Sequence, residues 1–78
     1  MNPRIKLIAT SHPDEDRMLV DILVDGEQLA VLIEGAEDHE FILYPRRDGM
    51  PWSLPKGLLL EAIEAATSRL DKLLPRRR

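Results

Sequence analysis

The dipeptide Asp25-Gly26 stands between two apolar segments and constrains the fold of this chain more than any other feature. Asp-Gly is well suited to a two-residue hairpin turn, because both central residues of that turn take positive φ. The flanking segments cover residues 17–24 and 28–34. Pairing Val24 with Glu27 closes the turn and makes the two segments antiparallel. The sequence therefore predicts a β-hairpin centred on Asp25-Gly26.

The predicted register places three apolar pairs on one face of this hairpin, which is the coherence expected of a genuine pairing. The pairs are Ile22 opposite Leu29, Val20 opposite Val31, and Met18 opposite Ile33. The other face carries three leucines, at Leu19, Leu23 and Leu32. Isolated exposed leucines are common on protein surfaces. The alternative is a second sheet or a partner subunit that covers this face.

Two further apolar segments, residues 5–10 and 40–44, bring the number of predicted strands to four. Pro45 follows the last of them directly. Proline has no amide hydrogen to give to a ladder, so this strand must stop there or lie at an edge of the sheet.

From Pro55 to about Leu74 the apolar residues recur at helical spacing. Ser53 suits the N-cap, Pro55 suits the first turn, and Pro75 prevents continuation of the helix. The stripe expected to face the sheet consists of Leu59, Ile63, Ala66, Leu70 and either Leu73 or Leu74.

The simplest assembly of these elements is a two-layer α+β domain. It contains a four-stranded antiparallel β-meander with one C-terminal α-helix packed on one face. We expect residues 1–75 to form this single domain and residues 76–78 to be a basic C-terminal tail. The absence of cysteine excludes disulfides and thiolate chemistry. With no signal-peptide pattern at the start and no apolar run long enough to span a bilayer, we expect a cytoplasmic protein.

The charge of the chain is divided between its two halves. Residues 1–40 carry ten acids and three bases, whereas residues 41–78 carry four acids and eight bases. In a meander the first and third connections lie at the same end of the sheet. That end should gather seven carboxylates beside His12 and His39; they belong to Asp14, Glu15, Asp16, Glu34, Glu37, Asp38 and Glu40.

Three interpretations of this acidic end compete. It is a solvated end that keeps a small protein soluble, a divalent-cation site, or a docking surface for a basic partner. The spacing of the acids and histidines fits neither an EF-hand loop nor a His-x-x-x-His helix. We therefore predict no metal and no cofactor, and favour the first and third interpretations.

Near the opposite end the chain combines aromatic and basic residues. These two types are the ones most enriched in binding hot spots, and they can also stack on exposed bases. The predicted contact residues are Tyr44, Arg46, Arg47 and Trp52. The alternative for Trp52 is a structural role, in which its ring fills the bottom of the helix–sheet interface.

The sequence carries no recognisable catalytic motif. Ser11 and His12 are neighbours, but no nucleophile-elbow pattern accompanies them, and no glycine-rich phosphate loop exists. We expect a protein that is not an enzyme but binds a larger protein with a basic surface, a class of partner that includes proteins that handle nucleic acid. By analogy of size and charge alone, small inhibitors such as antitoxins, immunity proteins and anti-CRISPR proteins are of this kind.

Two alternatives belong to other functional classes. Direct nucleic-acid binding would use Arg46, Arg47, Trp52 and the arginine tail, but the net charge of −3 argues against it. A self-associating structural subunit would use the leucines of the second hairpin face. Here we expect a monomer or a weak homodimer.

Overall fold

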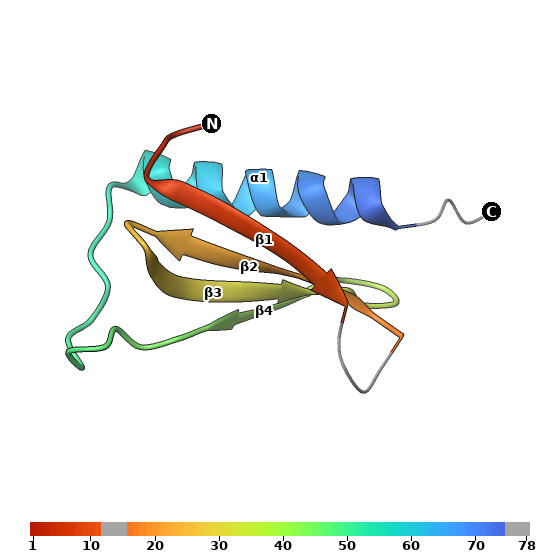
Figure 1. Cartoon of the computed structure of the whole chain (residues 1–78), viewed down its shortest axis with the longest axis horizontal. Helices are drawn as coiled ribbons and strands as arrows, with labels where there is room; N and C mark the ends of the chain where they lie inside the picture. Colours follow the sequence, from red (N-terminus) through yellow and green to blue (C-terminus); the bar gives the residue numbers. More distant parts are fainter. Residues whose placement is uncertain (12–15, 75–78) are drawn as a thin grey trace.

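A computed structural model describes residues 1–11 and 16–74 of the chain. Its elements in order are β1 (Ile5–Ser11), β2 (Met18–Val24), β3 (Glu27–Ile33), β4 (Glu40–Leu43) and α1 (Lys56–Leu73). The strands form one antiparallel sheet in the order β1-β2-β3-β4, and α1 lies across one face of it (Figure 1). The predicted two-layer α+β fold, a β-meander with a C-terminal helix, is confirmed.

The turn between β2 and β3 has the conformation that its dipeptide predicts. Asp25 has a φ of 53° and Gly26 a φ of 84°, so both central residues are left-handed. Val24 pairs with Glu27 across the turn. Arg4 fastens the turn to the start of β1, because its Nε and Nη2 lie 3.0 and 2.8 Å from the two carboxylate oxygens of Asp25.

The ion pair between Arg4 and Asp25 also makes the stability of the protein decrease at acid pH. The hydrogen-bonded guanidinium of Arg4 holds the pKa of Asp25 below its ordinary value. A lowered folded-state pKa contributes stability above the unfolded-state pKa, and that stability is lost as pH falls through the folded-state value. We expect urea unfolding followed by circular dichroism to show a loss of wild-type stability below about pH 4 that is smaller in Asp25→Asn.

Arg4→Gln serves as the second arm of the same experiment, because it removes the partner and keeps the carboxylate. It should reduce the acid-dependent loss as much as Asp25→Asn does. An undiminished loss in both variants would assign the acid sensitivity to other groups.

A β-bulge in β3 corrects the predicted register. Leu23 pairs with Gln28 as expected, but Ile22 pairs with Ala30, so Leu29 is an extra residue. Two residues of β3 therefore oppose one of β2, and every pair beyond that point shifts by one position. Val20 faces Leu32 instead of the predicted Val31.

The bulge also exchanges the two faces of β3, because successive side chains of a strand point to opposite sides. Leu29, Ala30 and Leu32 belong to the core beneath α1. Val31 and Ile33 lie outside that core, on the face of the sheet turned away from the helix. The assignment of Leu32 to the second face was wrong, and Val31 and Ile33 take its place there.

The helix meets the sheet through a row of residues spaced four apart. Leu58, Ala62, Ala66 and Leu70 are buried. The predicted stripe was right for Ala66 and Leu70, and the half-buried Leu59 and Leu74 also pack against the core. Ile63 is half-buried outside the core, and Leu73 is exposed. The two alanines explain the difference, because their small side chains let the helix backbone approach the sheet closely along this row.

The start of α1 also differs from the prediction. Pro55 occupies the N-cap position, where no side chain caps the helix, and its carbonyl accepts the amide hydrogen of Leu59 at 3.2 Å. Ser53 is therefore not the cap. Proline is compatible with a helix start because its fixed φ suits the first turn.

The position of α1 leaves one edge of the sheet uncovered. The helix packs mainly over β2 and reaches β1 and β3, but among the described residues it does not reach β4 (Figure 1). Leu43 of β4 points to the helix side of the sheet and is nevertheless 63% exposed. The strand β4 is thus an edge strand with apolar side chains open to solvent.

Candidate functional site

Asp16 and Glu34, one from each predicted acidic connection, line the same surface hollow at one end of the sheet. The amide of Glu34 donates to the carbonyl of Met18 at 2.9 Å, and the amide of Met18 donates to Glu34 Oε1 at 3.0 Å. Glu34 therefore closes the open end of the β2–β3 hairpin. Asp14 and Glu15, two of the predicted acids, lie outside the described residues, as do His12 and the arginine tail.

His39 holds the β3–β4 loop against the last turns of α1. The amide of Gly35 donates to its Nδ1 at 3.2 Å, and its Nε2 lies 3.1 Å from Asp71 Oδ1. Because Nδ1 accepts, Nε2 is the atom that carries the hydrogen donated to Asp71. Gly35 suits this tight loop, since a Cβ at that position would overlap the backbone carbonyl of Asp38.

Four predicted acids remain exposed at this end of the molecule. They make no ion pair with any described residue, and we call them the acidic rim: Asp16, Glu37, Asp38 and Glu40. Within residues 1–11 and 16–74, no three metal-ligating side chains lie close enough to hold an ion. Because no described residue forms an ion pair with these carboxylates, the rim can attract a basic surface.

At the opposite end, Trp52 serves the fold. Its indole Nε1 donates to the carbonyl of Tyr44 at 2.9 Å, and its ring packs against the core. The guanidinium of Arg46 lies 5.4 Å from the ring centroid, within range of a cation–π interaction. Arg46 also lies 3.7 Å from Asp48. Two of the four predicted contact residues therefore hold each other in place.

The other two, Tyr44 and Arg47, are exposed. The amide of Arg47 donates to Glu27 at 2.6 Å, while its guanidinium has no carboxylate partner among the described residues. Both residues line a surface hollow of about 480 Å³ beside the β2–β3 turn, together with Leu23 and Gln28. Arg47 thus has no ion pair among the described residues and lines the same hollow as the ring of Tyr44.

The face of the sheet turned away from α1 is the apolar surface that sequence reasoning underestimated. We call it the outer face and define it by Ile8, Leu19, Leu23, Val31, Ile33 and Ile42. Ile8 is 39% and Ile42 37% exposed. Asp21 also lies on this face and accepts a hydrogen bond from Gln28 at 2.7 Å. Val31 and Ile33 are only 4% and 9% exposed although α1 packs on the opposite face, so Ile8 and Ile42 are the most exposed apolar residues of the outer face.

One signal in the sequence points to this face. Residues 29–33 are apolar without interruption. A strand with one solvated face should alternate, whereas a continuous apolar run is typical of a strand buried on both faces. The run therefore indicates a second apolar face of the sheet, although the pattern alone does not reveal the bulge.

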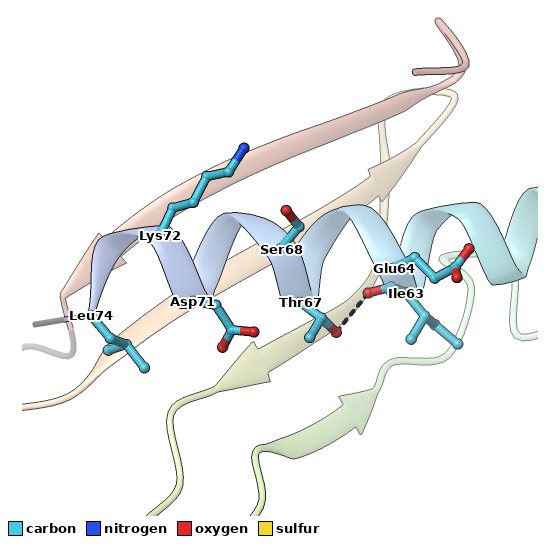
Figure 2. Close-up of a pocket in the computed structure, with 7 residues that line it drawn as sticks. All are labelled: Ile63, Glu64, Thr67, Ser68, Asp71, Lys72 and Leu74. Carbon is cyan, nitrogen blue, oxygen red and sulfur yellow. Dashed lines mark hydrogen bonds between the residues drawn. The ribbon is translucent and has the colours of Figure 1, made fainter. Parts of the chain in front are cut away.

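A surface hollow of about 680 Å³ follows the side of α1. Ile63, Thr67, Asp71 and Leu74 project from one side of the helix, as Figure 2 shows. The hydroxyl of Thr67 donates to the carbonyl of Ile63 at 2.8 Å, and Asp71 is held by His39. The polar groups of Thr67 and Asp71 are thus engaged within the protein, whereas Glu64, Ser68 and Lys72 also line the hollow.

Two global observations complete the description of the surfaces. In the described part of the chain, no helix is both long enough and apolar enough to cross a membrane. Of the three surfaces, the outer face is the most apolar and the acidic rim is the most charged. At the corner around Trp52, the indole N–H and the ring already interact with Tyr44 and Arg46.

No protein-family model, curated protein or solved structure matches this chain.

Proposed function

We propose that this chain is a non-catalytic protein-binding module that regulates a larger protein by docking on it through the outer face. The observation that carries the proposal is the β-bulge at Leu29. It turns Val31 and Ile33 toward the outer face, where they are buried and leave Ile8 and Ile42 as the most exposed apolar residues of that face. Contiguous apolar surface on a small protein is characteristic of an interaction site.

The chemistry of the partner follows from what surrounds this face. Burying the exposed parts of Ile8 and Ile42 favours an apolar patch on the partner, since apolar burial contributes about 25 cal/mol per Å². The acidic rim borders the face at one end and favours lysines and arginines next to that patch. The partner is therefore a protein with an apolar surface and a basic border, not a nucleic acid.

Capture from the native cell with matched variants tests the proposal. The wild type should retain one dominant protein that nuclease treatment does not release, and retention should weaken as salt rises. Ile8→Ser combined with Leu23→Ser should reduce retention at least about tenfold, because it makes the outer face polar on two strands.

The control places the same chemical change elsewhere. Leu60 and Met50 are exposed apolar residues outside the outer face, and replacing both with serine should leave retention unchanged. Recovery of nucleic acid alone, or equal loss in the two double variants, would contradict the proposal. Circular dichroism of each variant confirms that the fold is retained.

A further inference from the structure

The imidazole of His39 joins the start of the β3–β4 loop to the end of α1, and its two nitrogens have opposite roles in that junction. The amide of Gly35 donates to Nδ1 at 3.2 Å, and Nε2 donates its hydrogen to Asp71 Oδ1 at 3.1 Å. A backbone amide can only donate, so this arrangement requires a ring that carries no hydrogen on Nδ1. The contacts therefore select the neutral imidazole with its hydrogen on Nε2.

Protonation of the ring removes one of these contacts and keeps the other. In the imidazolium both nitrogens carry hydrogens, so Nδ1 and the Gly35 amide would face each other as two donors. Turning the ring over does not restore the acceptor. Nε2 still donates to Asp71, and that contact becomes a stronger, charge-assisted hydrogen bond. Gly35 is therefore the side of the junction that a proton releases.

We propose that His39 is a pH-sensitive latch on the β3–β4 loop. Its protonation detaches Gly35 from the ring, while the ring stays attached to α1 through Asp71. Histidine suits this role because its charge changes between about pH 5 and 8. The inference does not rest on the proposed function, since it concerns contacts within one chain and is measured without a partner.

The charges around the ring favour its protonated form. Asp71 faces the ring from α1, whereas Lys72 projects from another side of the helix (Figure 2). The other titratable groups at this end of the molecule come from the chain that follows β3 and from the β1–β2 connection: Glu34, Glu37, Asp38, Glu40, Asp16 and Arg17. Acids predominate, so their field promotes the release that the Gly35 hydrogen bond opposes.

Release of the latch changes the loop that carries part of the acidic rim. The side chain of His39 is only 20% exposed, so an amide that loses the ring as its acceptor must move to reach water. Gly35 also lies against the backbone carbonyl of Asp38, which couples the start of the loop to its tip. Glu37 and Asp38 are two of the four rim residues. Protonation of His39 therefore alters how these carboxylates are presented.

Nuclear magnetic resonance of the nitrogen-15-labelled chain tests the latch between about pH 5 and 8. At the high end, scalar coupling across the N–H···N hydrogen bond should connect the Gly35 nitrogen with Nδ1 of His39. The coupling should disappear in step with the protonation of His39, which the chemical shifts of its ring nitrogens report. Protection of the Gly35 amide from hydrogen exchange, corrected for the intrinsic pH dependence, should fall at least about tenfold.

Two variants serve as controls. Asp71→Asn keeps an oxygen that can accept from Nε2 but removes the charge, so it should retain the coupling at about pH 8 and move the release to lower pH by about 0.5 unit. His12→Gln removes the other histidine of the chain and should leave the release unchanged. The proposal is overturned by a coupling that is absent at about pH 8, by coupling or protection that persists after His39 is protonated, or by release in Asp71→Asn at the wild-type pH.

Discussion

Replacing Leu70 with alanine should lower the free energy of unfolding by about 3 kcal/mol. Leu70 is fully buried, and it is the last member of the row by which α1 contacts the sheet. The loss combines the transfer free energy of the deleted atoms with the cost of the cavity they leave. In a domain this small, that loss is a large share of the total stability.

Urea unfolding followed by far-ultraviolet circular dichroism measures this effect. Leu60→Ala is the matched control, because Leu60 belongs to the same helix and is 50% exposed. It should cost no more than about 0.5 kcal/mol. Equal losses in the two variants would contradict the described orientation of α1 on the sheet.

Replacing Trp52 with alanine should have the second largest effect, a loss of about 2 kcal/mol. The half-buried ring packs against the core, donates a hydrogen bond to the carbonyl of Tyr44 and lies under the guanidinium of Arg46. All three interactions disappear together, and the segment that connects β4 to α1 loses its anchor.

Trp52→Phe separates the contributions, since phenylalanine keeps an aromatic ring but cannot donate the hydrogen bond. It should cost about 1 kcal/mol, the typical net value of one hydrogen bond. The same urea titration measures both variants. If Trp52→Ala left stability unchanged, the ring would be available to a partner, and the corner would again be a candidate contact surface.

Local chemistry explains why most of the architecture is predictable. The Asp25-Gly26 turn requires two left-handed residues, and this dipeptide tolerates them, so the central hairpin follows from the sequence alone. The apolar residues after Pro55 recur with the period of an α-helix and so predict the C-terminal helix. Short connections between successive strands then favour the meander. Asp16 and Glu34 accordingly lie at the same end of the sheet.

The β-bulge could not be predicted, because the run from Leu29 to Ile33 is apolar at every position. Either register places apolar side chains on both faces, so the pattern does not distinguish them. Packing against the helix distinguishes the two registers, because in the folded protein Leu29 and Ala30 both belong to the core beneath α1. The identity of the outer face depends on that choice.

The roles of the charged and aromatic residues were also decided in three dimensions. The sequence by itself determined which segments are strands and which is the helix, the central turn and the separation of acidic from basic segments. The order of the outer strands in the sheet was decided by the tertiary structure. The tertiary structure decided that Glu34 and Trp52 serve the fold, while Glu37 and Arg47 form no ion pair with any residue in 1–11 or 16–74. The physical reason is range: turns and periodicity depend on neighbours along the chain, whereas burial and pairing depend on residues that only folding brings together.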